Sequence, residues 1–76
     1  MTLQQMHYAI VIAETGSLSR AAEQLYLSQP SLTAAMQELE RELGITIFNR
    51  GGRGVTVTQD GAEFLLYARQ VWESYE

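Results

Sequence analysis

Residues Leu18–Glu42, LSRAAEQLYLSQPSLTAAMQELERE, predict two helices joined by a tight turn. The first helix begins at Ser17 or Ser19, because either hydroxyl can accept a hydrogen bond from the free N–H groups of a helix start. The second helix begins at Ser28, and Pro30 fits its first turn, where the missing N–H has no intrahelical partner. Small and apolar residues recur on the inward faces of both helices, as a helix-turn-helix requires. These inward residues are Leu18, Ala21, Ala22, Leu25, Leu32, Ala35, Met36, Leu39 and Leu43.

The opposite face of the second helix is small and polar. It carries Pro30, Thr33, Ala34, Gln37 and Arg41. Thr33 and Gln37 supply hydrogen-bonding groups without much bulk, so this face is able to enter a major groove and contact base edges. The pattern therefore predicts a recognition helix.

The composition bounds the class of protein. The chain has 76 residues, no cysteine and one histidine, which predicts one small domain without a disulfide framework or a zinc site built on thiolates or several histidines. No apolar run approaches the ~20 residues that cross a bilayer, and the start lacks the regions of a signal peptide. We therefore expect a cytoplasmic protein with no membrane partner.

The charge balance argues against a nucleic-acid partner. The net charge is -4 and lysine is absent, whereas nucleic-acid-binding proteins are usually basic. The distribution of charge must then matter more than its sum. If the chain binds DNA, Arg20, Arg50 and Arg53 have to share one side of the molecule with Thr33 and Gln37, and the acidic residues have to point elsewhere.

An N-terminal helix is expected over Leu3–Glu14, capped by Thr2 and ended by Gly16. Its apolar residues occupy more than one side, which predicts burial against the helix-turn-helix and against another helix. His7 lies beside this apolar stripe. Since no second metal-binding side chain is nearby, a structural histidine is favoured over a metal ligand.

A β-hairpin is predicted where two β-branched runs, Ile45–Arg50 and Val55–Thr58, flank the glycine-rich tip Gly51–Gly54. The tip lacks the lysine and the strand-to-helix context of a P-loop, which argues against a nucleotide site. Arginines at its base and tip favour a wing against a DNA backbone. A solvated hairpin whose arginines have no partner is an equal alternative from these residues alone.

A last helix is expected after Thr58, which would cap it. Its apolar stripe is longer than one small domain needs to cover, so we expect one face to pack on the N-terminal helix and another to pair with a partner. The residues assigned to this dimerisation surface are Phe64, Leu65, Ala68, Val71, Trp72 and Tyr75.

No enzymatic activity is expected. With one histidine and no thiol, the chain cannot form a Ser/His/Asp or Cys/His set. Glu38 and Glu42 lie one helical turn apart, which is typical of a solvated helix face and gives no reason to assign a general acid and base.

Four segments together resemble the N-terminal DNA-binding domain of LysR-type transcriptional regulators. They are AETGSLSRAAEQL, SQPSLT, LERELGITIFNR and VTVTQDG, and the resemblance covers nearly all of the chain. It implies a mainly α fold, with a winged helix-turn-helix of three helices and a two-stranded wing over residues 1–58 and a long linker helix over residues 59–76 that pairs two subunits. It also implies a larger C-terminal effector-binding domain, so the chain is expected to be part of a longer regulator and to hold no cofactor itself.

The resemblance also implies sequence-specific binding of double-stranded DNA by a bacterial transcriptional regulator. The recognition helix, about residues 28–43, would enter the major groove, and the wing, residues 45–58, would meet the backbone or the minor groove. The implied DNA contacts are Arg20, Ser28, Gln29, Pro30, Ser31, Thr33, Gln37, Arg50 and Arg53.

The other implied partners are a second copy of the chain, through the linker helix, and RNA polymerase for the full-length regulator. A small-molecule effector would bind the C-terminal domain. The alternative is a protein-interaction or dimerisation module with little DNA affinity, which the net charge of -4 and the apolar stripe favour.

Overall fold

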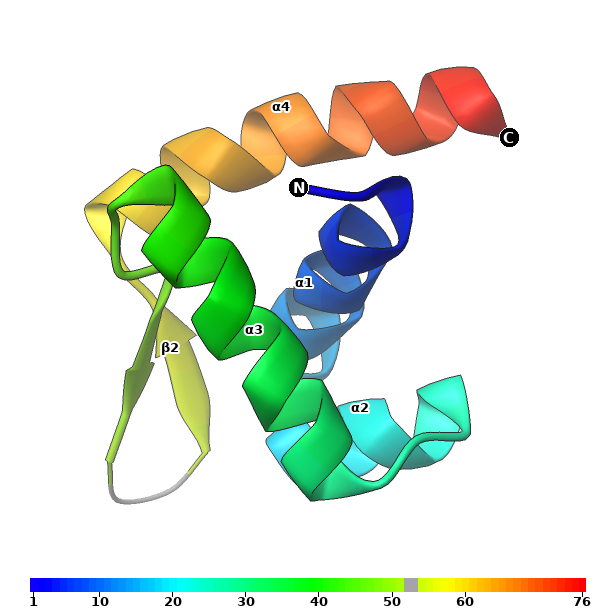
Figure 1. The fold of residues 1–76 in the computed structure, drawn as a ribbon, viewed down its shortest axis with the longest axis vertical. Helices are drawn as coiled ribbons and strands as arrows, with labels where there is room; N and C mark the ends of the chain where they lie inside the picture. Colours follow the sequence, from blue (N-terminus) through cyan, green and yellow to red (C-terminus); the bar gives the residue numbers. More distant parts are fainter. Residues whose placement is uncertain (52–53) are drawn as a thin grey trace.

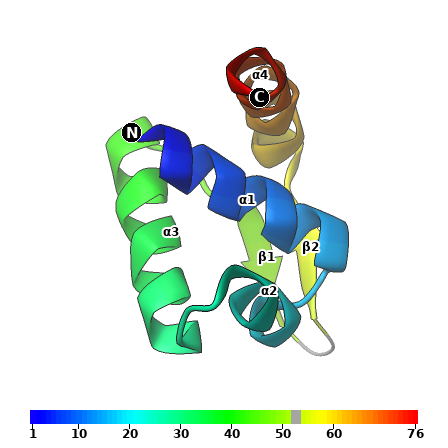
Figure 2. The ribbon, with the colours of Figure 1, turned by 90° about the vertical axis from the view of Figure 1, so that its right-hand side faces the viewer.

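The computed structural model describes residues 1–51 and 54–76, and it places four helices and one two-stranded antiparallel sheet in those ranges. The elements are α1 Leu3–Thr15, α2 Leu18–Leu25, α3 Gln29–Leu43, β1 Phe48–Arg50, β2 Val55–Val57 and α4 Gln59–Tyr75. Helix α4 crosses one end of the molecule, and the hairpin extends from there toward the end that holds α2 and the start of α3 (Figure 1). Seen from the side, α1 lies between α4 and α2 (Figure 2). The predicted mainly α, winged helix-turn-helix fold is confirmed.

The helix boundaries follow from local side-chain chemistry. A hydroxyl caps the start of every helix, and the caps are Thr2, Ser17, Ser28 and Thr58. Ser17 accepts a hydrogen bond from the Arg20 N–H, which settles the choice between Ser17 and Ser19. Helices α1 and α3 end at Gly16 and Gly44, whose φ values of 68° and 71° are left-handed and favour glycine.

The core lies where α1 and α4 pack on the helix-turn-helix that α2 and α3 form. The largest fully buried side chains are Ile12, Leu32, Met36, Leu39 and Ile47. The small residues Ala21 and Ala22 are also buried, so α2 approaches its neighbours closely, as the sequence predicted.

The junction between the hairpin and α4 is fixed at Ile47. The N–H groups of Ile47 and Phe48 donate to Oε2 of Glu40, at 2.7 and 3.2 Å. The carbonyl oxygen of Ile47 accepts from the Thr58 N–H at 2.9 Å, and Gly61 packs directly against the same peptide. The end of α3 and the start of α4 are thereby held to one segment of backbone.

The hairpin is pinned at its other end to the turn between α1 and α2. The Val55 N–H donates to the carbonyl oxygen of Gly16 at 3.0 Å. Gly54 has a φ of +88°, and a Cβ there would lie 2.7 Å from the same Gly16 oxygen. The strands pair in the register Phe48↔Val57, Asn49↔Thr56 and Arg50↔Val55. They are shorter than predicted because the Ile47 N–H donates to Glu40 and not across the hairpin.

The apolar stripe of α4 is divided between two roles, which corrects the predicted dimerisation surface. Phe64, Leu65 and Ala68 are 8%, 3% and 0% exposed, because they pack in the core of their own chain. These side chains are not free for a second subunit. Val71 and Trp72 are half-buried against the same core, and Tyr75 alone of the six assigned residues is well exposed.

None of the helices in the described ranges has the length and apolar character needed to span a bilayer.

Candidate nucleic-acid interface

The outward face of α3 forms a shallow hollow of about 400 Å³ at its N-terminal half. The hollow is lined by Gln29, Pro30, Thr33, Ala34 and Gln37. All except Thr33 are exposed, and Thr33 is half-buried. The described residues of the lining include no charged side chain, so their polar character comes from two amides and one hydroxyl. Such groups can donate to and accept from base edges.

Two serines at the start of α3 share their hydrogen bonds. The Ser31 N–H donates to Oγ of Ser28 at 3.2 Å, and the Ser28 hydroxyl donates to Oγ of Ser31 at 2.8 Å. Ser28 is therefore engaged as a helix cap, whereas the hydroxyl proton of Ser31 is not used by these bonds. Of the two predicted contacts, Ser31 has the free donor.

A second hollow, of about 240 Å³, lies between the starts of α2 and α3 and the far end of the wing strands, at Arg50, Gly54 and Val55. Gln29 lines both hollows, so the α3 face and the wing form one continuous surface. Arg50 lines this second hollow together with Ser17 and Ser19. Within residues 1–51 and 54–76 the one ion pair joins the N-terminal amine to Glu42, so Arg50 is not neutralised by a carboxylate there.

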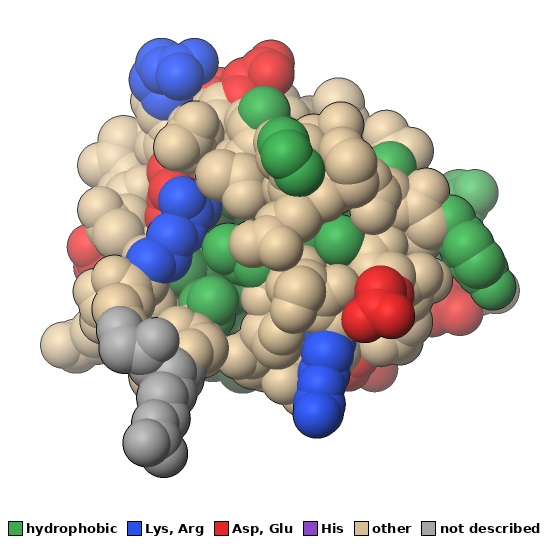
Figure 3. Space-filling model, turned by 90° about the horizontal axis from the view of Figure 1, so that it is seen from below, with side chains coloured by type: hydrophobic (Ala, Val, Ile, Leu, Met, Phe, Trp, Pro, Cys, Tyr) green, Lys and Arg blue, Asp and Glu red, His purple; other side chains and the backbone are tan. Residues whose placement is uncertain are grey.

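Arg20 is exposed on α2, next in sequence to Ser19. Arg53 lies outside the described residues, so its contact with DNA stays a prediction. The molecular end that carries α2, the start of α3 and the wing shows basic side chains at separate places around a largely uncharged centre (Figure 3). Acidic side chains are visible near the edge of the same face. The expectation that all acidic residues lie on other sides of the molecule is therefore wrong.

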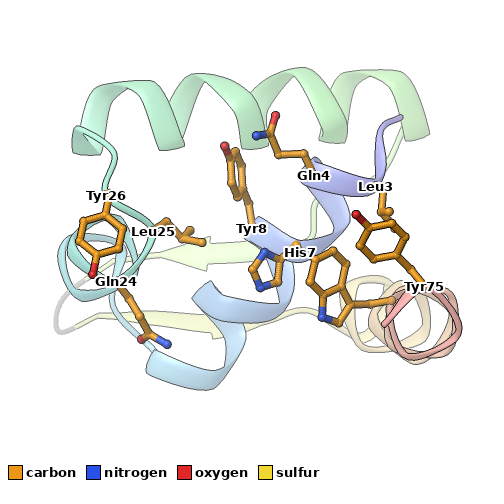
Figure 4. A pocket seen from close by; sticks show the side chains of 9 residues that line it. Leu3, Gln4, His7, Tyr8, Gln24, Leu25, Tyr26 and Tyr75 are labelled. Atoms are coloured by element: carbon orange, nitrogen blue, oxygen red, sulfur yellow. The ribbon is translucent and has the colours of Figure 1, made fainter.

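A third hollow, of about 570 Å³, lies on another side of the molecule, across α1 from the end of α2 to the end of α4. Its walls include Tyr8, Tyr26 and Tyr75 (Figure 4). His7 stacks on Trp72 here, with ring centroids 4.0 Å apart and planes 5° apart, which fits a structural histidine. The described residues contain no cluster of three or more potential metal ligands.

The sequence analysis missed three residues that the structure makes relevant. Ser19 was considered only as a possible helix cap, but it is exposed and lines the hollow that contains Arg50. Leu66 and Tyr67 lie off the predicted stripe of α4 and are 67% and 52% exposed. An apolar pair outside the buried stripe was the available signal, because such residues gain nothing from the chain's own core.

Residues 3–62 match the family of bacterial regulatory helix-turn-helix proteins of the lysR type. The chain belongs to this family. It is 41% identical over 73 residues to the HTH-type transcriptional regulator TcbR of Pseudomonas sp. (strain P51), covering 96% of this chain and 25% of TcbR. It is 42% identical over 71 residues to the regulator TfdT of Cupriavidus pinatubonensis, covering 93% of this chain and 31% of TfdT. The chain thus spans less than a third of these lysR-family relatives.

Solved structures of the same family agree in fold. The CbnR DNA-binding domain in its complex with DNA is 40% identical, with a TM-score of 0.94 over 99% of this chain and 86% of that one. The BenM DNA-binding domain bound to the catB site 1 DNA is 36% identical, with a TM-score of 0.94 over 99% of this chain and 81% of that one. The relatives named here are transcriptional regulators or their DNA-binding domains, and none is an enzyme.

Proposed function

We propose that this lysR-family chain is the sequence-specific DNA-binding part of a bacterial transcriptional regulator. The observation that carries the proposal is the continuity of two hollows through Gln29, which places the polar face of α3 beside Arg50 of the wing. The α3 face, through Thr33 and Gln37, enters the major groove and contacts base edges. Arg50 contacts the phosphate backbone next to that groove.

The roles within the interface follow from chemical type. Gln29 and Gln37 carry amides that pair well with adenine edges, and Pro30 and Ala34 keep the face small enough to approach the bases. Ser28, Ser31, Arg20 and Arg53 remain assigned to backbone or base contacts. The relatives that were solved with DNA, the CbnR and BenM domains, support this assignment by their close similarity in fold.

A matched pair of arginine substitutions tests the proposal. A duplex is first selected from a random pool, and its affinity is then measured by fluorescence anisotropy against salt concentration. Arg50→Ala is expected to weaken binding to selected and scrambled duplexes alike, and to reduce the slope of log K against log salt by about 0.9 for each phosphate that the arginine neutralises. Arg69→Ala removes the same charge from α4, outside both hollows but beside the exposed Leu66, so both variants are compared at concentrations where sedimentation shows the same oligomeric state. Under that condition Arg69→Ala is expected to leave the slope nearly unchanged.

Equal effects of Arg50→Ala and Arg69→Ala would refute the assignment of Arg50, because only net charge would then matter. If no duplex binds detectably even at low salt, the DNA-binding proposal fails. The alternative of a protein-interaction module would then be favoured.

We also propose that residues 1–58 act as the DNA-binding unit and residues 59–76 as a linker helix that pairs two copies of the chain. The free surface for pairing is the side of α4 that exposes Leu66 and Tyr67, next to a hollow lined in part by Ala13 and Val57. Tyr75 lies instead beside Trp72, in the wall of the hollow across α1. A dimer doubles the DNA contacts, which a subunit with few cations needs.

The properties of a longer regulator are part of the same proposal. A small-molecule effector would bind beyond these residues, and RNA polymerase would be contacted by the full-length protein. The cytoplasm is the compartment in which such a regulator meets DNA.

A further inference from the structure

The hollow between the wing and the starts of α2 and α3 offers hydrogen-bond donors, and no carboxylate of the described residues lines it. Ser19 comes from α2, Gln29 from the start of α3, and Arg50 from β1, so the donors approach from three elements. Among residues 1–51 and 54–76 no Asp or Glu lines the hollow, although the whole chain has a net charge of -4. A guanidinium, an amide and a hydroxyl arranged around one concavity suit an anion with several oxygens.

The hydrogen bonds already made in this hollow leave one proton of the Ser17–Ser19 pair free. Oγ of Ser17 accepts from the Arg20 N–H at 3.2 Å, because Ser17 caps α2. Oγ of Ser17 and Oγ of Ser19 are 3.1 Å apart and share one hydrogen bond. Two hydroxyls have two protons, and that bond uses one. Either hydroxyl can be the donor in this bond, because each oxygen has two lone pairs and the Ser17 oxygen can accept a second hydrogen bond. In both arrangements one of the two protons remains for a ligand, and Ser19 is the exposed member of the pair.

The walls of the hollow are held by backbone contacts. The Val55 N–H donates to the Gly16 carbonyl oxygen at 3.0 Å, so the far end of the wing strands is tied to the residue that precedes the α2 cap. At Gly54 there is no room for a Cβ, which would come within 2.7 Å of that same oxygen. This close approach fixes the distance between the wing and the α2 start. A preformed site binds without first ordering its donors.

We propose that this hollow binds one phosphate of the DNA backbone, held by the Ser19 hydroxyl, the Gln29 amide and the Arg50 guanidinium. The inference rests on the proposed function and adds Ser19 as a DNA contact. The phosphate carries no sequence information, but binding it between the wing and α2 fixes how deep and at what register α3 lies in the groove. Gln29 lines both hollows, so it joins this backbone contact to the base-reading face.

The test combines a side-chain deletion with a deletion on the DNA. The selected duplex is made in a series in which one phosphate at a time is replaced by a neutral methylphosphonate. With the unmodified duplex, Ser19→Ala is expected to weaken binding about three- to tenfold. With the wild-type protein, a methylphosphonate at one position in each half-site is expected to weaken binding as well. In Ser19→Ala, the methylphosphonate at that position is expected to weaken binding less than it does for the wild type, because the two changes remove the same hydrogen bond.

Two further variants test whether the loss of DNA affinity is due to the Ser19 hydroxyl. Ser19→Thr keeps a hydroxyl and is expected to recover most of the affinity. Ser74→Ala removes a hydroxyl from α4, where it donates to the Gln70 carbonyl oxygen, and is expected to have no effect on DNA binding. Ser19→Ala leaves the salt slope unchanged because it removes no charge, unlike Arg50→Ala.

The proposed site would be refuted if Ser19→Ala bound DNA with wild-type affinity. It would also be refuted if, at every phosphate position, the loss caused by Ser19→Ala and the loss caused by the methylphosphonate were additive in free energy. The DNA-binding proposal would still stand in that case, because the wild-type protein would still bind the selected duplex. Absence of binding by the wild-type protein would overturn both.

Discussion

Gly61 offers the sharpest test of how the fold is held together, because the structure leaves no space for a side chain there. A Cβ at this position would lie 2.3 Å from the carbonyl oxygen of Ile47 and 2.9 Å from its carbonyl carbon and Cα. These neighbours are backbone atoms, and real Cβ atoms essentially never come so close. The Ile47 oxygen also accepts hydrogen bonds from the N–H and Oγ1 of Thr58, at 2.9 and 3.2 Å. Gly61→Ala therefore forces α4 and the hairpin junction apart.

The expected free-energy change can be worked from opposing effects. Alanine is favoured over glycine in a helix by up to about 1 kcal/mol. Overpacking typically costs about 1–3 kcal/mol and occasionally more, and here the clash is with backbone that cannot rotate away. Moving Ile47 also weakens its hydrogen bonds to Thr58, each worth about 0.5–1.5 kcal/mol net. We expect Gly61→Ala to lower the free energy of unfolding by about 2–3 kcal/mol.

The assay is urea and thermal unfolding of the chain followed by circular dichroism, at fixed protein and salt concentrations. For a domain of this size, about 2–3 kcal/mol corresponds to a fall in Tm of roughly 10–20 °C. Gly51→Ala is the matched control, because nothing lies within 4 Å of a Cβ at Gly51 and its φ is not left-handed. The control is expected to stay within about 0.5 kcal/mol of the wild type. A Gly61→Ala protein as stable as the wild type would refute this account of the junction.

Two further predictions concern the same framework and its proposed partner. Glu40→Ala is expected to lower the free energy of unfolding by about 1–3 kcal/mol in urea titrations, because two part-buried backbone N–H groups lose their acceptor, and Glu40→Gln is expected to recover part of that stability. Equal stability of Glu40→Ala and the wild type would show that water replaces the carboxylate. Leu66→Gln is expected to weaken self-association at least tenfold in sedimentation equilibrium, since a polar side chain replaces an apolar one on each copy of a symmetric dimer. An unchanged dissociation constant would place the pairing surface elsewhere.

The local parts of the fold could be predicted because single side chains determine them. Thr2, Ser17, Ser28 and Thr58 cap helices, and Gly16 and Gly44 end them, through hydrogen bonds and φ values that involve near neighbours in sequence. The buried stripe of α3 was visible for the same reason, since its periodicity is set within one helix.

The long-range parts could not be predicted from the same patterns. Glu40 looks like one more acid in an acidic helix, and only the path of the chain brings the N–H groups of Ile47 and Phe48 to it. The α4 stripe could not be divided in advance either. Phe64 and Leu65 are as apolar as Leu66, but only three-dimensional packing shows that the first two face the core of the same chain.

The part of the candidate interface that lies on α3 could be predicted from the sequence. The part that α2, α3 and the wing form together could not. Thr33 and Gln37 follow from the helical period, because they lie opposite the buried Leu32 and Leu39. The hollow that contains Ser19 and Arg50 depends on how the wing approaches α2, a distance set by the contact of Gly54 with Gly16. No spacing in the sequence encodes that approach.

The net charge of -4 is compatible with specific DNA binding because of where the acidic groups lie. Glu40 is hydrogen-bonded to backbone and Glu42 pairs with the N-terminal amine, so part of the acidic charge is used within the fold. In the part of the chain that the structure describes, no acidic side chain lines either hollow of the candidate interface. Non-specific affinity comes almost entirely from cations on phosphates, and few cations keep it low. Hydrogen bonds from neutral amides and hydroxyls do not depend on net charge in that way. The acidic net charge therefore lowers the affinity for non-specific DNA more than the affinity for the specific site. The ratio of specific to non-specific affinity is raised as a result.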